Sequence, residues 1–290
     1  MPVKKKVTEQ QLASLFKDAC MAELTALKPG NVHIFADGHG MVVQDFIKSA
    51  EVTATVIAQP GLNVGQRILN AVNATWDAVA CNTNLGIVLL SAPIIQAALQ
   101  HDNAPLQTKL HSVLNSLKVE DAALSFQAIQ RASPAGLGTS DKHDVHAVPE
   151  ITLLAAMQEA AHRDTIARQY DNGYADILGF GLDRYRQALI KWDKQAWAVT
   201  ALYLGFLANY DDSHVLRKFG AGTSSALRDE ARLHEHALMQ LDNPKLYQRQ
   251  LMDWDAALKT RGLNPGTSAD LTVATLLALD INSSSSIEHR

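Results

Sequence analysis

The sequence predicts an all-α protein. Apolar residues recur every three or four positions almost throughout the chain, which is the spacing of amphipathic helices. Alanine and leucine, which favour helices, are abundant, whereas aromatic residues make up only 6% of the 290 residues. No run of six residues alternates apolar and polar side chains with β-branched enrichment, so strands are not expected.

The first predicted helix begins after Thr8, which forms a capping-box pattern with Gln11. It should end before Pro29-Gly30, because proline and glycine stop helices. The apolar spacing predicts the remaining helices over 43–58, 64–79, 85–99, 104–118, 119–131, 149–169, 174–191, 193–209, 221–240, 244–261 and 268–280.

The length permits one large domain or two small ones, and we expect a single helical domain over 1–290. Residues 1–7 and 283–290 are expected to be frayed tails. The composition, 47% apolar and 19% charged, is that of a globular chain. The net charge of −4 offers no basic field for nucleic acid.

The sequence indicates a cytoplasmic protein without a membrane segment. Cys20 and Cys81 lie far apart and form no CxxC pattern, which argues against disulfides or a zinc site. No apolar segment follows the N-terminal lysines, so a signal peptide is not expected. The uncharged stretch 78–100 contains amides and Pro93, and its continuously apolar part is too short to span a bilayer.

Four connections between the predicted helices concentrate Gly, Asn, His, Asp, Lys and Arg: 28–41, 81–86, 211–220 and 264–270. A fifth, 133–146, is similar but less dense. Polar loops on a rigid scaffold are where binding and catalytic residues commonly lie. We therefore expect an active site built from inter-helix loops.

The first loop combines Lys28, Asn31, His33 and His39 with glycines. A lysine and backbone N–H groups beside glycine suit phosphate oxygens. The alternative is a Pro-Gly turn with solvated polar residues.

The second loop places Asn82 and Asn84 inside an otherwise uncharged stretch. Burying an unpaired amide costs roughly 1–3 kcal/mol, so these side chains should cap a helix or contact a ligand. Asn84 is the expected N-cap of the next helix. Both roles are compatible, because a helix N-terminus also attracts phosphate.

The third loop contains the adjacent carboxylates Asp211 and Asp212. Mg²⁺ prefers such oxygen ligands together with substrate phosphates, which Arg217 and Lys218 could also hold. The alternative is that Asp212 or Ser213 caps a helix while the basic residues are solvated.

In the fourth loop, Thr267 or Ser268 is expected to cap the last helix and to place Asp270 in its first turn. An acidic residue there suits the helix dipole. Exposed backbone N–H groups beside an aspartate would also suit a metal–phosphate site.

In order, these loops resemble the signature blocks of the triphosphoribosyl-dephospho-coenzyme A synthase family, which accompanies citrate lyase and malonate decarboxylase systems. The residues that match its first, third and last blocks are Lys28-Pro29-Gly30, His39-Gly40-Met41, Asp212-Ser213-His214, Arg217, Gly220 and Pro265 to Leu271. The second block departs, because Asn84 and Leu85 stand where the family has a histidine and a basic residue.

The resemblance implies an all-α transferase with ATP as substrate and Mg²⁺ as cofactor. In that reaction the hydroxyl of 3′-dephospho-coenzyme A displaces adenine from C1 of the ATP ribose. The implied catalytic residues are His33, His39 and Asp212. The implied phosphate- and substrate-binding residues are Lys28, Asn31, Asn82, Asn84, Ser213, Arg217, Lys218 and Ser268. The implied metal ligands are Asp211, Asp212 and Asp270.

The departures at Asn84 and Leu85 favour a divergent branch with a different acceptor or donor, for example in the biosynthesis of one-carbon carriers. A phosphotransferase, a ribosyl hydrolase and a non-catalytic nucleotide-binding protein stay open as alternatives. The expected partners are a nucleotide and a cofactor-type acceptor, and the Ala- and Leu-rich helices are compatible with a homodimer.

Overall fold

The computed structural model describes residues 7–134 and 144–284, in which every regular element is a helix and no strand occurs. The all-α prediction is therefore confirmed. The first six helices are α1 Glu9–Thr25, α2 Val43–Ile57, α3 Val64–Val79, α4 Leu85–Ala98, α5 Leu106–Ser116 and α6 Val119–Ala132. The others are α7 Leu153–Ala160, α8 Thr165–Asp171, the π-helix η1 Asp176–Gly181, α9 Leu182–Trp192, α10 Gln195–Asn209, α11 Ser213–Gln240, the 3₁₀-helix η2 Pro244–Tyr247, α12 Gln248–Thr260 and α13 Gly266–Ser284.

The helix boundaries in the first half follow the predicted periodicity closely. The capping box that begins α1 is present: Thr8 Oγ1 accepts from the Gln11 N–H at 3.2 Å, and Gln11 Oε1 accepts from the Thr8 N–H at 2.8 Å. At the predicted N-terminal tail, Val7 is buried. At the other end α13 continues to Ser284, two residues into the predicted C-terminal tail. The rest of both tails, 1–6 and 285–290, lies outside the described residues.

Two predicted boundaries in the second half are wrong. The expected helix 149–169 is two helices, because Asp164 accepts the Ile166 and Ala167 N–H groups and starts α8 anew. The segment 211–220, expected to be a loop, is helical from Ser213 onward. Its helix is kinked at Gly220, whose φ of 83° and ψ of 170° are not helical.

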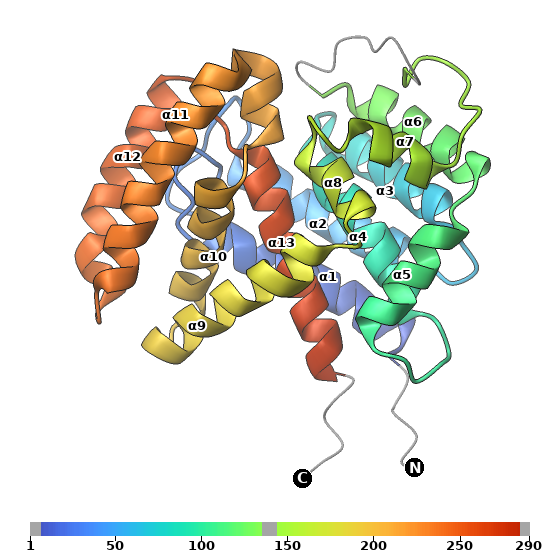
Figure 1. The fold of residues 1–290 in the computed structure, drawn as a ribbon, viewed down its shortest axis with the longest axis horizontal. Coiled ribbons are helices and arrows are strands. Elements are labelled where there is room, and N and C mark those ends of the chain that lie inside the picture. Colours follow the sequence, from blue (N-terminus) through green and yellow to red (C-terminus); the bar gives the residue numbers. More distant parts are fainter. Residues whose placement is uncertain (1–6, 135–143, 285–290) are drawn as a thin grey trace.

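Helix α13 is the central element of the fold. Figure 1 shows it running between one group of helices, α9 to α12, and another, α2 to α8. It packs against α1, α4, α10 and α11, and its side chains are buried on nearly all faces. A helix that is apolar all round is stable only when neighbours cover it completely. The charge-poor helix α4 is buried in the same way.

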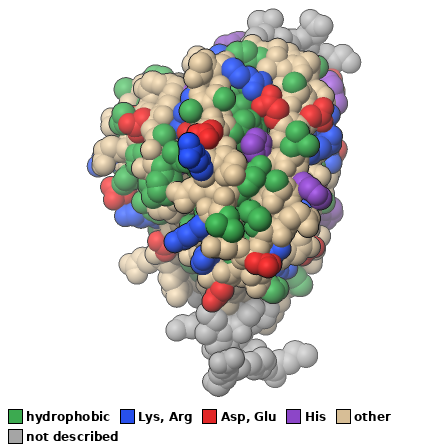
Figure 2. All heavy atoms as spheres, turned by 90° about the vertical axis from the view of Figure 1, so that its left-hand side faces the viewer, with side chains coloured by type: hydrophobic (Ala, Val, Ile, Leu, Met, Phe, Trp, Pro, Cys, Tyr) green, Lys and Arg blue, Asp and Glu red, His purple; other side chains and the backbone are tan. Residues whose placement is uncertain are grey.

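Among the described residues no helix is both long and apolar enough to cross a membrane. Figure 2 shows the face on the α11 and α12 side of the molecule, where acidic and basic side chains are interspersed. On this face the basic residues therefore form no continuous stripe.

Candidate active site

A cavity of about 690 Å³ lies where the four polar connections meet. This volume is within the usual range for small-molecule sites, about 300–1,000 Å³. Its polar lining comes from several elements and consists mainly of Glu23, Asn31, His39, Asn82, Thr83, Asn84, Asp164, His214, Arg217, Lys218, Asn264, Thr267 and Asp270. Apolar side chains line another part, chiefly Phe46, Ile87, Phe126, Ile129, Leu153, Met157 and Ile166.

The structure divides the predicted site residues into two sets. Those that line the cavity are Asn31, His39, Asn82, Asn84, Arg217, Lys218 and Asp270. Those that do not line it are Lys28, His33, Asp211, Asp212, Ser213 and Ser268. Asp211 of the second set is partly exposed, and the other members of this set are buried outside the lining.

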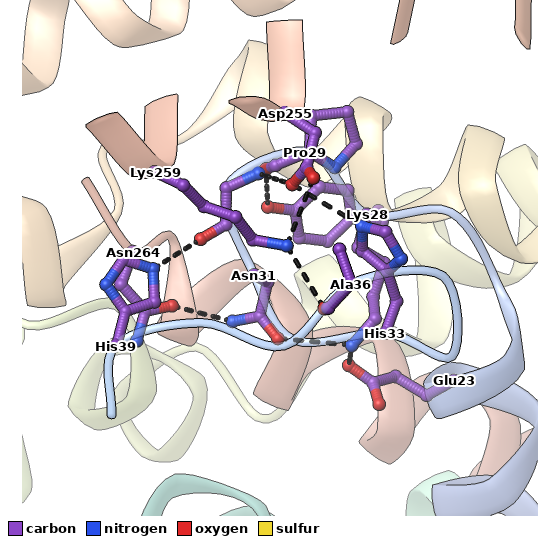
Figure 3. A network of polar contacts seen from close by, with 12 residues as sticks. Glu23, Lys28, Pro29, Asn31, His33, Ala36, His39, Asp255, Lys259 and Asn264 are labelled. Carbon is purple, nitrogen blue, oxygen red and sulfur yellow. Dashed lines mark hydrogen bonds and ion pairs between the residues drawn. The ribbon is translucent and has the colours of Figure 1, made fainter. Parts of the chain in front are cut away.

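The connection 28–41 is fixed by a helix far away in the sequence, as Figure 3 shows. The Gly30 N–H donates to Asp255 Oδ1 of α12 at 2.8 Å. Lys259 donates both to Asp255 Oδ2 at 3.0 Å and to the Ala36 carbonyl at 3.1 Å. Burial alone would raise the pKa of Asp255, but the contacts from His33, Gly30 and Lys259 outweigh it and lower that pKa.

Gly30 is required at its position for two reasons. Its φ of +85° lies in the left-handed region, which side chains rarely adopt. A Cβ would also lie 2.9 Å from Pro265 Cδ and 3.1 Å from the Leu263 carbonyl oxygen. The first connection and the chain around the fourth connection therefore pack closely against each other at this glycine.

The two histidines of this connection have different environments. His39 lines the cavity, and its Nε2 lies 2.8 Å from the Gly30 carbonyl oxygen. In a neutral ring that bond makes Nε2 the protonated nitrogen and leaves Nδ1 as an acceptor. His33 is fully buried, with Nε2 3.4 Å from Asp255 Oδ1. Burial lowers the pKa of His33, with Asp255 acting against it, and the ring does not line the cavity.

Lys28 is also buried behind the cavity wall, at 1% exposure. Its ammonium donates to Glu23 Oε1 and to Asn31 Oδ1, the latter at 3.1 Å. Asn31 in turn donates to Asn264 Oδ1 at 2.8 Å. Glu23, Asn31 and Asn264 all line the cavity, so Lys28 connects three cavity residues without reaching the cavity itself.

The start of α4 is capped differently from the prediction. Asn84 occupies the N-cap position but makes no capping bond, and its Nδ2 donates to Thr53 Oγ1 at 2.9 Å. Asn82 Oδ1 accepts the Leu85 N–H at 3.1 Å instead. At Gly86 a Cβ would lie 2.0 Å from Asp270 Oδ2, so a glycine is what lets α4 approach the Asp270 carboxyl.

Asp212 is a structural carboxylate that joins two helix starts. Its Oδ1 accepts the N–H groups of His214 and Val215 at 3.1 and 3.2 Å, as the N-cap of α11. Its Oδ2 accepts the N–H and Oγ–H of Ser268 at 2.8 and 2.9 Å. A carboxylate offers about four lone-pair sites, and these four bonds occupy them. Burial raises the pKa of Asp212, and the bonds from Ser268 act against this.

The neighbours of Asp212 are used in a similar way. Asp211 forms an ion pair with Arg228 at 3.1 Å and accepts from Ser224 at 3.1 Å. Ser213 Oγ accepts the Thr165 N–H at 2.6 Å, which ties the start of α8 to the start of α11.

Asp270 contrasts with Asp212. It lies in the second turn of α13 instead of the predicted first turn, because the helix begins at Gly266 and not near Ser268. Within the described residues its carboxyl makes no hydrogen bond or ion pair. Burial, followed by the nearby charges of Asp212 and Glu23, raises the pKa of Asp270 well above its usual value.

The described residues contain no group of three or more His, Cys, Asp or Glu side chains placed to hold a metal. Mg²⁺ commonly takes only one or two protein carboxylates and completes its shell with water and substrate phosphates. Of the three predicted metal ligands, Asp270 fits that arrangement, because it lines the cavity with uncommitted oxygens.

Two cavity residues near α11 escaped the sequence-based prediction of the site. Asp164 accepts from Arg217 Nη1 at 2.7 Å while it caps α8. His214 packs against Gly266, where a Cβ would lie 2.9 Å from its Nδ1. Burial, followed by the charges of Arg217 and Lys218, lowers the pKa of His214 to about 4, so its ring is neutral at pH 7.

Comparisons with known proteins identify the family of the chain. A family model described as CitG, ATP:dephospho-CoA triphosphoribosyl transferase, matches residues 9–288. A solved structure from Archaeoglobus fulgidus, described as a proposed triphosphoribosyl-dephospho-CoA synthase, is 20% identical with a TM-score of 0.61. The match covers 82% of this chain and 97% of that one, and it shows a shared fold. No curated protein matches the chain. Because the family model spans nearly the whole sequence, the chain belongs to the CitG family of triphosphoribosyl-dephospho-CoA synthases, which are transferases.

Proposed function

We propose that the protein transfers a triphosphoribosyl group from ATP to a hydroxyl of a cofactor-type acceptor and releases adenine. The observation that carries this proposal is the meeting of all four family-like connections at one cavity. Cationic side chains of α11 and the uncommitted carboxyl of Asp270 line it together. Such a cavity suits a ligand that bears both phosphates and a sugar.

Arg217 and Lys218 are the proposed phosphate-binding pair. Both line the cavity, and Arg217 uses one guanidinium nitrogen for Asp164, which leaves donors for a ligand. Asn82, Asn84 and the N-terminus of α4 supply further polar groups. Lys28 does not contact the ligand in this proposal, and it positions the cavity residues Glu23 and Asn31 through its hydrogen bonds.

Asp270 is the proposed protein ligand of Mg²⁺. When bound with the triphosphate, the ion would neutralise phosphate charge there. Asp212 supports this position, since it joins the start of α11 to the start of α13. Asp211 is not part of this proposed metal site, because it pairs with Arg228 and does not line the cavity.

A histidine of the cavity is proposed to accept the proton of the acceptor hydroxyl. His39 is favoured over His33 because it lines the cavity and keeps Nδ1 available. His33 is enclosed behind the loop. Proton transfer by a positioned histidine contributes typically 10²- to 10⁴-fold to a rate.

The acceptor is proposed to be a cofactor-type molecule with a sizeable apolar or aromatic part. Helices α4, α6, α7 and α8 contribute apolar side chains to the lining, and these suit such a part of a ligand better than they suit phosphates. Dephospho-CoA is the acceptor that the family description names. Asn84 and Leu85 line the same cavity, so the departures in the second block favour an alternative acceptor in the same reaction.

The test incubates the protein with ATP, Mg²⁺ and dephospho-CoA and measures free adenine by chromatography. Adenine release that needs the acceptor supports the proposal. ADP or phosphate without adenine would point to a phosphotransferase or a hydrolase. ATP binding seen as a raised Tm, with no turnover for any acceptor tried, would point to a non-catalytic nucleotide-binding protein.

A further inference from the structure

We infer that Glu23 is a catalytic residue, the carboxylate that stabilises positive charge on ribose C1 as adenine departs. This inference rests on the proposed function. In that reaction the bond from C1 to the adenine nitrogen breaks, and its electron pair leaves with adenine. The acceptor oxygen forms the new bond to C1. The acceptor hydroxyl loses one proton and adenine gains one, so protons balance.

Glu23 combines burial with access to the cavity. It lies near the C-terminal end of α1, is only 5% exposed to solvent and lines the cavity. A carboxylate in such a site acts on nearby charge far more strongly than one in water, because little solvent screens it. Transfer at C1 of a sugar develops oxocarbenium character, which a carboxylate at close range stabilises.

Lys28 orients this carboxylate and opposes the effect of burial on it. Its ammonium donates to Glu23 Oε1, and Asn31 Oδ1 holds the same ammonium at 3.1 Å (Figure 3). Burial raises the pKa of Glu23, and the attraction and hydrogen bond of Lys28 oppose that rise. Asn31 is itself fixed by Asn264 at 2.8 Å, so the geometry is set from both sides of the cavity wall.

The remaining oxygen of Glu23 is uncommitted, which separates this residue from the other partnered carboxylates nearby. Within the described residues Glu23 Oε2 makes no hydrogen bond. Asp164 uses one oxygen to cap α8 and the other for Arg217. Asp212 uses both oxygens for helix starts. Among the described residues Asp270 forms no ion pair that would orient it, and the proposed function uses it as a metal ligand.

A purely structural role would also explain a buried ion pair, since Glu23 and Lys28 tie α1 to the connection 28–41. Buried pairs are often replaceable by neutral residues without loss of stability. The two roles differ in what a neutral replacement does to the chemical step. A structural pair tolerates it, whereas a catalytic carboxylate does not.

The experiment measures adenine release and Tm for the wild type, Glu23→Gln and the double variant Glu23→Gln with Lys28→Met. Glu51→Gln is the matched control, because Glu51 pairs with Lys17 at 3.1 Å on the exposed surface. We expect Glu23→Gln to lower kcat on the order of 100-fold with little change in KM for ATP. The double variant, which contains no buried charge at this pair, should fold and be as slow. Glu51→Gln should match the wild type.

If Glu23→Gln is too unstable to assay, the double variant decides. Suppose that the wild type releases adenine and that the folded double variant has a kcat within about 3-fold of the wild-type value. This result would overturn the catalytic role of Glu23 but leave the proposed function standing. A raised KM with unchanged kcat would also overturn it, since Glu23 would then contribute only to binding. A wild type that releases no adenine would contradict the proposed function and this inference together.

Discussion

The connection 28–41 and the start of α11 each carry basic residues that the sequence assigns to phosphate binding, yet the contacts of these residues differ. Lys28 is enclosed and forms an ion pair with one oxygen of Glu23, whereas Arg217 lies at the cavity and pairs only at one nitrogen with Asp164. The first region is held by α12, more than two hundred residues away, and the second by its own cap, Asp212. The comparison shows that basic residues in a polar connection can indicate where a site lies, but not whether each of them contacts the ligand or supports the wall.

Lys28→Met should have the largest effect on stability in this comparison. It leaves the Glu23 carboxylate buried without a partner, which costs about 3–5 kcal/mol. Urea unfolding at pH 8, compared with the neutral double variant, measures this. Equal stability of the single and double variants would show that the pair is not coupled.

Gly86→Ala should come next. The added Cβ would lie 2.0 Å from Asp270 Oδ2, so α4 or Asp270 must move. Overpacking of this kind costs about 1–3 kcal/mol, and displacement of Asp270 should also remove Mg²⁺-dependent ATP binding. Gly179→Ala, where a Cβ would meet nothing, is the control. ATP titrations with and without Mg²⁺ decide, and unchanged binding in Gly86→Ala would contradict the placement of Asp270.

Asp212→Asn and Asp270→Asn should have opposite effects on stability. Asp212→Asn disturbs four hydrogen bonds at two helix starts and should cost about 1–2 kcal/mol. Asp270 has a folded-state pKa raised above its unfolded value, so its ionisation favours unfolding. Wild-type stability should therefore fall as pH rises from the unfolded pKa toward the folded one.

Asp270→Asn should abolish this part of the pH dependence and leave the protein at least as stable as the wild type at pH 7. Denaturant unfolding between pH 4 and pH 8 measures both aspartate variants. A strongly destabilised Asp270→Asn protein would show that this carboxyl has a partner in the fold.

Arg217→Ala should have the smallest effect on stability, because an ion pair that is still partly exposed to solvent contributes about 0–1 kcal/mol. Its effect on function should be larger, with KM for ATP raised about 10-fold or more, since a charge-assisted contact to phosphate is lost. Arg186→Ala, which removes an exposed pair with Asp183, is the control. The same KM in both variants would remove Arg217 from the phosphate site.

The periodicity of apolar residues predicted the fold well because helices α1 to α6 are delimited by local signals such as the Thr8 capping box. It failed at Asp164, where the apolar spacing continues through a point at which a side chain caps a new helix. It failed again at Ser213, because a cluster of polar residues resembles a loop even when it forms the first turns of a helix.

The candidate site could be located from the sequence, but which of its predicted residues line the cavity could not be told. The four polar connections do meet at one cavity. Lys28 does not line the cavity, because its ammonium pairs with Glu23. The connection that carries Lys28 is held by Asp255, which accepts from Gly30 and lies 225 residues from it. Glu23 itself lies within a regular helix, where nothing local distinguishes it from a solvated glutamate.

The central claim is that this cavity binds the ATP triphosphate at α11 and its metal at Asp270. A crystal structure of the protein with ATP and Mg²⁺, without an acceptor, tests it most directly. The account predicts phosphate oxygens in hydrogen-bond contact with Arg217 and Lys218, and a metal about 2.0–2.1 Å from an Asp270 oxygen. A triphosphate bound outside the cavity, or a metal held away from Asp270, would contradict it.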